Sequence, residues 1–510
     1  MFKKILVANR GEIAVRVLRA CRELGIASVA VYSAADRAAL HVSRADEAYS
    51  IGPANAAQSY LDPSRILDVA RRCGADAIHP GYGFLSENAD FAEACAHAGI
   101  KFIGPGAATM RRMGFKTSAR QAMAEIGVPQ VPGSSGNLGL EDARREARKM
   151  GYPVMLKAAA GGGGKGMRRV DSEPEMESAH RTARSEAQRA FNNDELYLEK
   201  LIVNPRHIEI QLLADEHGNV VYLGERECSL QRRHQKVMEE SPSPLVDDEL
   251  RRRMGEMAVQ AARSAGYVNA GTIEFLVDSS RNPYFLEMNT RLQVEHPVTE
   301  MVTGLDLVHL QIRVAAGQKL PFRQEDIQLR GHAMECRIYA EDPQNNYYPS
   351  PGVITALQTP SGPGIREDSG IYEGWRVPVE YDPLLSKLVA FGASREMVIA
   401  RLRRALDEYF VGGIKTNLKL FRQILENEEF VAGRLHTGLL DQIIGRQEPG
   451  RPGQVFPGGA DDEIAAVAAA LLHHRQSGQA RNGRSHGPDA SRSPHDVSRW
   501  KETARREGLR

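Results

Sequence analysis

The chain has 510 residues and a formal net charge of +1, because its 66 lysines and arginines almost balance its 65 aspartates and glutamates. This length allows about three domains with buried cores. A chain so close to neutrality has no overall field that attracts nucleic acid or an anionic membrane. The sequence contains no stretch of 18 apolar residues, which excludes an ordinary membrane-spanning helix.

The cysteines indicate the redox environment. They are scattered and never stand in a CxxC spacing: Cys21, Cys73, Cys95, Cys228 and Cys336. This pattern indicates buried or free thiols in a reducing compartment, and neither disulfides nor a zinc site. The N-terminal apolar stretch is too short before its first polar turn to be a signal peptide. We therefore expect a cytoplasmic protein.

The N-terminal pattern predicts a strand over residues 4–8, a helix over 12–24 and a strand over 27–32. This βαβ unit is typical of a Rossmann-like parallel sheet, but its turn lacks a GxGxxG motif, which favours a plain α/β layer. A further strand over 75–78 runs into a loop in which Tyr82 and Phe84 each follow a glycine. These rings either face a ligand at the carboxyl end of the sheet or cover its edge.

A second unit begins near Gly114. Strands are predicted over 152–156 and 167–170, and between them stand Lys157, four consecutive glycines and Lys165. Glycines let backbone N–H groups approach phosphate oxygens, so the segment is interpreted as a flexible lid over phosphates. It is not a Walker A loop, because no Ser/Thr follows the lysine and no helix comes next. The alternative is an unliganded surface hairpin.

A strand over residues 195–199 follows, and a cationic run comes later. Residues 231–236 hold two arginines, His234 and Lys236. Such a run is usually a solvated face, but near carboxylate-rich strands we interpret it as an anion site.

Residues 272–277 and 284–288 predict a hairpin around a turn-rich loop. If Val277 pairs with Tyr284, the register places Glu274 opposite Glu287. Facing carboxylates destabilise a sheet unless a cation lies between them, and oxygen ligands of this kind suit Mg²⁺ bound to substrate phosphates. The alternative is a solvated hairpin whose acids meet no metal.

The decapeptide at residues 287–296 continues this hairpin. In an extended chain it would place five polar side chains on one face: Glu287, Asn289, Arg291, Gln293 and Glu295. Side chains alternate along a strand, so the apolar residues between them share the other face. The polar face predicts a cation site at its glutamate end and a site for a small anion at its arginine end.

Several motifs together resemble the biotin carboxylase component of biotin-dependent carboxylases, a family with an ATP-grasp core. They are Gly161–Met167, Asn204–His207, Gln231–Lys236, Glu287–His296 and Glu335–Asp342, and the resemblance runs from Lys3 to about Gly445. It implies ATP-dependent carboxylation of biotin by bicarbonate, as the first half-reaction of an acetyl-CoA, other acyl-CoA or pyruvate carboxylase. Fatty acid biosynthesis is the implied pathway for the acetyl-CoA type.

The resemblance also implies roles for individual residues. Around ATP it places Tyr82, Lys116, Lys157, Gly163, Gly164, Glu199, Lys200, Leu201, Ile202, His207, Gln231, His234 and Leu276. It assigns Mg²⁺, with Mn²⁺ as an alternative, to Glu274, Glu287 and Asn289, and bicarbonate to Lys236, Arg291 and the backbone of Val294. It implies that Glu295 is the general base and that Arg337 stabilises the biotin enolate.

The implied fold is α/β. It consists of an N-terminal Rossmann-like domain at 1–113, an ATP-grasp domain at 114–330 with a glycine-loop lid at about 130–203, and a mixed α+β domain at 331–446. Residues 447–510 form a Pro/Gly linker and a helical or disordered tail. We expect that tail either to dock a partner or to fold back on its own domain.

The resemblance implies a homodimer that uses Arg19, Glu23 and Arg366, although Pro363 replaces an aromatic residue often found there. No biotinylation tetrapeptide such as Ala-Met-Lys-Met is present. Biotin is therefore expected on a separate carrier protein, with a carboxyltransferase subunit as a further partner. Two alternative functions remain: another ATP-grasp ligase, and a catalytically silent scaffold or regulatory subunit.

Overall fold

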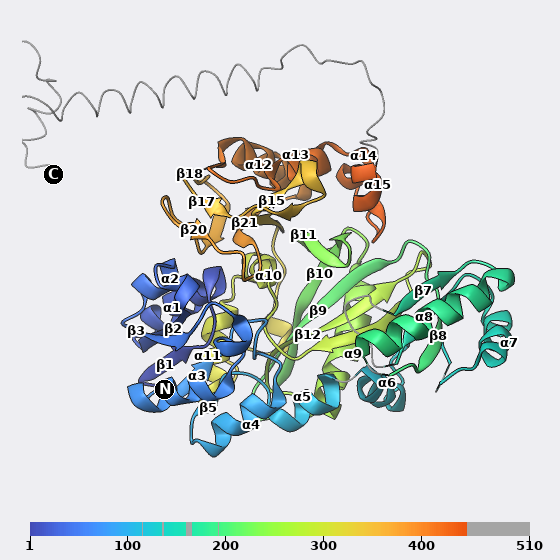
Figure 1. Cartoon of the computed structure of the whole chain (residues 1–510), viewed down its shortest axis with the longest axis horizontal. Helices are drawn as coiled ribbons and strands as arrows, with labels where there is room; N and C mark the ends of the chain where they lie inside the picture. The colour runs from blue at the N-terminus through green and yellow to red at the C-terminus, as the bar shows by residue number, and fades with distance from the viewer. Residues whose placement is uncertain (115, 135–136, 160–165, 192, 446–510) are drawn as a thin grey trace, which may run out of the picture. The chain divides into compact units, whose positions relative to one another are not determined.

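The computed structural model of the protein describes residues 1–114, 116–134, 137–159, 166–191 and 193–445 (Figure 1). The predicted βαβ unit is present at the N-terminus. β1 (Lys4–Val7) pairs in parallel with β2 (Ala27–Ser33), and α1 (Gly11–Glu23) connects them. β3 (Glu47–Gly52), β4 (Ala77–His79) and β5 (Lys101–Phe102) complete a sheet in the order β3-β2-β1-β4-β5.

The helices of this region are α2 (Leu40–Arg44), α3 (Pro63–Cys73), α4 (Ala89–His97) and α5 (Ala107–Gly114). Helix α3 shows how local sequence sets a boundary. The Asp62 side chain accepts hydrogen bonds from the first turn, Pro63 occupies the first position, and Gly74 ends the helix with φ +68°. These are the residue types that favour helix starts and stops.

A separate three-stranded sheet forms the lid, in the order β7-β6-β8. β6 (Val154–Ala158) pairs antiparallel with β7 (Met167–Val170) and with β8 (Leu196–Lys200). The glycine-rich segment therefore connects two antiparallel strands, as expected, while residues 160–165 lie outside the described part. α7 (Leu140–Met150) and α8 (Met176–Phe191) cover this sheet and bury a small apolar core of their own.

The central sheet has eight strands in the order β13-β12-β9-β10-β11-β14-β21-β19. Its first five strands are β9 (Arg206–Ala214), β10 (Val220–Arg232), β11 (Gln235–Ser241), β12 (Asn269–Val277) and β13 (Pro283–Asn289). Helix α9 (Asp248–Ser264) packs on β9 and β10, and α6 (Lys116–Glu125) packs on β13. Helices α10 (His296–Thr303) and α11 (Leu307–Ala315) follow.

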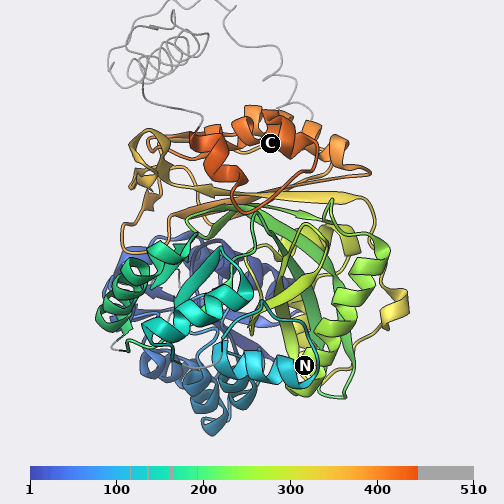
Figure 2. The ribbon, with the colours of Figure 1, turned by 90° about the vertical axis from the view of Figure 1, so that its right-hand side faces the viewer.

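The C-terminal region is mixed α+β, and it extends the central sheet. It supplies β14 (His332–Tyr339), β19 (Ile365–Ser369) and β21 (Leu384–Gly392), with β14 pairing antiparallel to β11. Its short strands are β15 (Glu341–Asp342), β16 (Tyr348–Pro349), β17 (Gly352–Val353), β18 (Ala356–Gln358), β20 (Arg376–Val377) and β22 (Phe410–Gly412). Figure 2 shows its helices above these strands: α12 (Arg395–Glu408), α13 (Leu418–Glu426), α14 (Glu428–Val431) and α15 (Leu439–Gly445).

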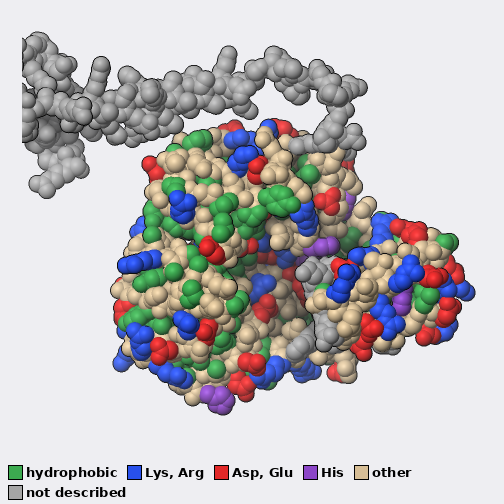
Figure 3. Space-filling view, in the orientation of Figure 1, with side chains coloured by type: hydrophobic (Ala, Val, Ile, Leu, Met, Phe, Trp, Pro, Cys, Tyr) green, Lys and Arg blue, Asp and Glu red, His purple; other side chains and the backbone are tan. Residues whose placement is uncertain are grey.

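The β11–β14 pairing matters for the candidate site, because it joins C-terminal strands to the sheet that contains the β12–β13 hairpin. A hollow lined by charged side chains opens between the lid and the rest of the described molecule (Figure 3). No helix of the described residues is long and apolar enough to cross a membrane.

Candidate active site

The hairpin of β12 and β13 places Glu274 directly opposite Glu287, as the sequence predicted. The assumed path to that register was wrong by one residue, because Val277 pairs with Pro283 and Leu276 with Tyr284. A bulge between Glu274 and Phe275 restores the offset. Such a bulge adds one residue to one strand, and it is common beside active sites.

The prediction that residues 287–296 are extended throughout was wrong. β13 ends at Asn289, and Glu295 occupies the N-cap of α10 with φ −80° and ψ 10°. Pro297 stands in the first turn of that helix, where its fixed φ favours a helix start. The polar side chains still converge, because Asn289 Nδ2 and Gln293 Nε2 both donate to Glu274 Oε1, at 2.7 and 2.9 Å.

Lys236 lies at the centre of the site. Its ammonium group donates to Glu274 Oε1 and Glu295 Oε1, each at 2.9 Å, and also to Glu209 Oε1. At Lys236, therefore, the cationic run at residues 231–236 faces buried carboxylates and not solvent. Three nearby carboxylates raise the pKa of Lys236 well above its ordinary value despite the opposing effect of burial. Lys236 is charged at any physiological pH.

Glu295 is held between two cations. One carboxylate oxygen accepts from Lys236, and the other accepts from Arg337 NH2 at 2.9 Å. Burial raises the pKa of the Glu295 carboxyl, but Lys236 and Arg337 outweigh that effect and hold it below its usual range. Glu295 is thus ionised and able to accept a proton.

Arg291 reaches a partner that the sequence did not indicate. Its Nε donates to Glu87 Oε2 at 2.9 Å, and its NH2 donates to Asn289 Oδ1 at 3.1 Å. Glu87 lies in the loop after β4 and also accepts from the backbone N–H of Thr290. The loop at the carboxyl end of β4 therefore touches the site, although the residue that does so is an acid and not one of the predicted aromatics.

The predicted aromatic residues of that loop have other partners. The Tyr82 hydroxyl donates to Glu12 Oε1, and the Lys387 ammonium lies 5.9 Å from the Tyr82 ring centre. The Phe84 ring stacks on Tyr60, with ring centres 5.0 Å apart. Phe84 therefore covers the sheet, the second of the two predicted alternatives. Tyr82 lies beside Glu12 and Lys387, and Lys387 in turn donates to the Val294 carbonyl.

Glu209 and Arg226 also belong to the site, and neither was predicted from the sequence. Arg226 is fully buried, and it donates to Glu209 Oε2 at 3.2 Å and to Thr272 Oγ1 at 3.1 Å. It also contacts Gln293. Both residues stand in strands that are buried along almost their whole length, where a charged side chain must be paired. That irregularity in the strand pattern was the available signal.

Of the residues expected around ATP, Lys157, Glu199 and Lys200 lie on the lid strands β6 and β8. Lys157 on β6 donates to Glu199 on β8, and Lys200 Nζ donates to the Gly151 and Tyr152 carbonyls at 2.7 and 3.2 Å. Leu201 and Ile202 follow β8 in the chain. The side chain of Lys116, which begins α6, and the glycines Gly163 and Gly164 lie outside the described residues.

His207 on β9 lies between Glu274 and Gln231. Its Nε2 lies 2.9 Å from Glu274 Oε2, and its Nδ1 lies 3.1 Å from Gln231 Nε2. Burial lowers the pKa of His207, but Glu274 outweighs it and raises the value to about 9. Leu276 pairs with His207 across the strands, and His234 lies exposed at the β10–β11 turn with φ +65°.

Three family models match most of the described chain. The biotin carboxylase N-terminal domain matches residues 1–110, the carbamoyl-phosphate synthase L chain ATP binding domain matches 116–323, and the biotin carboxylase C-terminal domain matches 335–442. Biotin carboxylase 1 of Bacillus subtilis is 52% identical over 443 residues, which cover 86% of this chain and 98% of that protein.

The chain belongs to the biotin carboxylase family.

Two further relatives of this family carry different acceptors in their names. The alpha subunit of mitochondrial methylcrotonoyl-CoA carboxylase from Rattus norvegicus is 53% identical, and the match covers 86% of this chain but only 62% of that protein. The biotin carboxylase domain dimer of 2-oxoglutarate carboxylase from Hydrogenobacter thermophilus, in complex with MgADP, ADP and bicarbonate, has a TM-score of 0.82 at 48% identity. That match covers 87% of this chain and 99% of that one.

As a member of the biotin carboxylase family, this chain is an ADP-forming ligase that carboxylates biotin with ATP and bicarbonate. Its ATP-grasp core uses ATP with Mg²⁺. The donor set of the hairpin fits such an ion, because two facing carboxylates and an amide oxygen are hard ligands that leave room for phosphate oxygens and water.

Proposed function

We propose that Glu295 is the general base that deprotonates bicarbonate, and that Lys236 and Arg291 bind that anion with the backbone N–H of Val294. The observation that carries this proposal is the pair of cations on Glu295, Lys236 through one oxygen and Arg337 through the other. Bicarbonate is a poor nucleophile until its proton is removed. A carboxylate beside an anion site supplies both requirements.

The reaction then proceeds by phosphoryl transfer. Bicarbonate loses its proton to Glu295, one of its oxygens attacks the γ-phosphorus of ATP, and the bond to ADP breaks. The product is carboxyphosphate. Glu274, Glu287 and Asn289 would hold Mg²⁺, which supplies positive charge to the phosphate oxygens when bound. Lys157, Glu199–Ile202, His207, Gln231, His234 and Leu276 would surround the nucleotide, together with Lys116, Gly163, Gly164 and Tyr82.

Carboxyl transfer to biotin needs negative charge on the ureido oxygen to be stabilised. The guanidinium of Arg337 suits this role because it is always charged and carries several donors. Arg337 is 8% exposed, so that charge would act with little screening from solvent. The ureido nitrogen forms a bond to the carboxyl carbon of carboxyphosphate, the carbon–oxygen bond to phosphate breaks, and the departing phosphate takes the nitrogen's proton.

The assembly is also part of the proposal. We infer that biotin is carried by a separate carrier protein in the cytoplasm and that a carboxyltransferase subunit completes the enzyme. The names of relatives at nearly equal identity include a methylcrotonoyl-CoA carboxylase and a 2-oxoglutarate carboxylase. The acceptor is therefore an acyl-CoA, with acetyl-CoA as one candidate, or an oxo acid such as pyruvate. Domain boundaries at 113, 330 and 446 complete this proposal.

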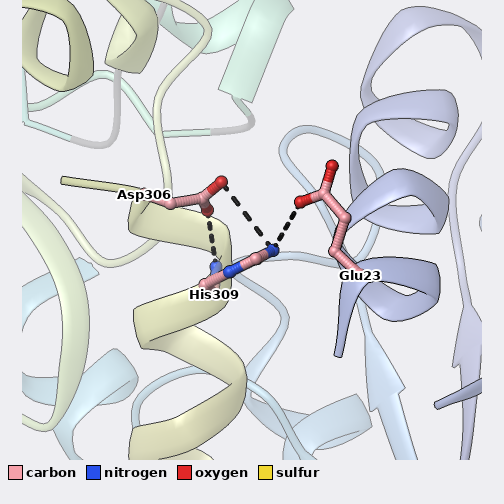
Figure 4. A group of neighbouring side chains, drawn as sticks. All are labelled: Glu23, Asp306 and His309. Carbon is pink, nitrogen blue, oxygen red and sulfur yellow. Dashed lines mark hydrogen bonds and ion pairs between the residues drawn. The ribbon is translucent and has the colours of Figure 1, made fainter. Parts of the chain in front are cut away.

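A homodimer through the face of α1 is proposed as well. Arg19 and Glu23 are exposed on α1, and Glu23 Oε2 lies 2.9 Å from His309 Nε2 on α11, where Asp306 also lies close (Figure 4). Arg366 is held by Asp368 and Glu300 at 2.8 and 2.7 Å. Glu23 is thus oriented from within its own subunit while its side chain stays 61% exposed.

The test is the dependence of ADP release on each substrate. Purified full-length protein should release ADP with bicarbonate, Mg²⁺ and free biotin, and omission of biotin or bicarbonate should remove most of that activity. Carboxybiotin formed from labelled bicarbonate should match the ADP released. Robust ADP release with ammonia or an amino acid, and none with biotin, would instead assign the chain to another class of ATP-grasp ligase.

A further inference from the structure

Two buried glutamates behind Arg337 have no part in the reaction described above. Glu239 on β11 and Glu335 on β14 are direct partners across antiparallel strands, and they are 1% and 0% exposed. Glu239 Oε1 accepts from Arg337 Nε at 2.6 Å. The other oxygen of Glu239 and both oxygens of Glu335 have no hydrogen-bond partner among the described residues.

Three unpartnered carboxylate oxygens in one place require a physical reason. A buried acceptor without a donor destabilises the folded state, and a charged one does so more strongly. Directly opposed side chains on antiparallel strands have Cβ atoms about 5 Å apart, so these two carboxyl groups are within reach of each other. If both were ionised they would repel, whereas one proton between them turns the contact into a hydrogen bond.

The cation that faces Glu335 has other partners. Lys387 lies opposite Arg337 on β21, and its ammonium donates to the Val294 carbonyl at 2.9 Å and lies 3.2 Å from Glu12 Oε1. The charged and titratable groups that face the pair are Arg337, Cys336 and Tyr339 on β14, Lys387 on β21, Lys236 on β11, Cys228 on β10 and Glu295 ahead of α10.

We propose that Glu335 is held as a neutral acid that shares its proton with Glu239, and that this proton keeps Arg337 available to Glu295 and to biotin. Glu239 and Glu335 are thus positioning residues. The inference rests on the role proposed for Arg337. If the proton is lost, a second buried negative charge appears beside the guanidinium, competes for it, and repels bicarbonate and the biotin enolate.

The electrostatic environment agrees with this geometry. Burial raises the pKa of Glu335 well above its ordinary value, with Lys387 and Arg337 opposing and Glu239 adding to the rise. Burial likewise raises the pKa of Glu239 to about 7, although Arg337 lowers it. The pair therefore holds a proton near neutral pH and loses it as the pH rises.

The experiment combines infrared spectroscopy with a pH profile on full-length protein. The wild type should show the carbonyl stretch of a neutral carboxylic acid at neutral pH, and Glu335→Gln should lack it. In the same variant, the alkaline loss of kcat/KM for free biotin should move to higher pH by about 1 unit or more, because the amide cannot ionise. Glu335→Asp serves as a second variant, in which the band should persist at a shifted frequency.

Glu240→Gln is the matched control. Glu240 is the neighbouring buried acid on β11, but it is fully paired with His332 and Arg395, at 2.6 and 2.7 Å. Its substitution should leave the band and the alkaline midpoint unchanged. A wild type without the band, or a Glu335→Gln profile that matches the wild type, would overturn the inference while leaving the proposed function intact. Absence of biotin carboxylation in the wild type would instead remove the proposed function.

Discussion

Glu274 and Glu287 face each other across β12 and β13, and a bulge beside Glu274 is what brings them together. Without that bulge, the observed pairing of Leu276 with Tyr284 would have placed Glu274 opposite residue 286. Glu274 is buried and accepts hydrogen bonds from Lys236, Asn289 and Gln293, whereas Glu287 is half-buried. The two acids therefore differ in how safely each can be substituted.

Glu287→Gln should raise the Mg²⁺ concentration needed for half-maximal ADP release by about tenfold or more, because one charged oxygen ligand is lost. Because Glu287 is half-buried, the substitution should change the stability of the fold little, and thermal unfolding measures this. Glu249→Gln, at an exposed position on α9, is the control. An unchanged Mg²⁺ requirement in Glu287→Gln would contradict the proposed metal site.

Glu295→Gln should lower biotin carboxylation about 10²-fold or more, the scale expected for a missing general base. The affinity for ADP, measured by calorimetry, should stay close to that of the wild type because the base acts on bicarbonate. A variant that retained near wild-type turnover would remove Glu295 from this role.

Glu335→Gln should also change how stability depends on pH. The folded state raises the pKa of Glu335. The native protein therefore keeps a proton that the unfolded chain releases above its ordinary value of 4.5. This stabilisation is complete below the unfolded pKa and is lost as the pH rises through the folded pKa. The free energy of unfolding of Glu335→Gln relative to the wild type, measured in urea, should thus increase as the pH rises above 4.5. A constant difference would show that Glu335 does not titrate abnormally.

Truncation after Arg446 should leave carboxylation of free biotin intact and weaken assembly with a biotin carrier or carboxyltransferase subunit. The family models end at residue 442, and the tail that follows lies outside the described residues. Its sequence places Trp500 among basic residues, a combination common in interfaces. Co-purification with the partner subunits measures the second effect. Loss of free-biotin activity with assembly preserved would mean that the tail stabilises its own chain.

The sequence predicted what local patterns determine. The βαβ unit, the glycine segment between two strands and the facing of Glu274 and Glu287 all follow from alternation, turn residues and short-range pairing. The pairing of Glu274 with Glu287 was predicted correctly, but from a hairpin register that is wrong by one residue. The bulge that compensates for this error could not be located from the sequence. Strand β13 ends at Asn289, earlier than the alternation suggested, and α10 begins at His296 with Pro297 in its first turn.

Long-range partners escaped prediction for a different reason. Arg291 and Glu87 are 204 residues apart, and Arg337 and Glu239 are 98 apart. Nothing in the local sequence selects one such pair among the many charged residues of the chain. The continuation of the central sheet through β11 and β14 brings the latter pair together, and that pairing became visible only in three dimensions.

The contacts of Lys387 also bear on the order in which the enzyme matures. This fully buried side chain donates to the Val294 carbonyl from 93 residues further along the chain, and it contacts Glu12, which lies near the N-terminus of the chain. Ribosomes synthesise the N-terminal segments first, and long-range contacts must wait for their distant partners. The backbone beside Glu295, the proposed base, therefore acquires this support only after β21 has emerged. A nascent chain that stops before that strand lacks both contacts of Lys387.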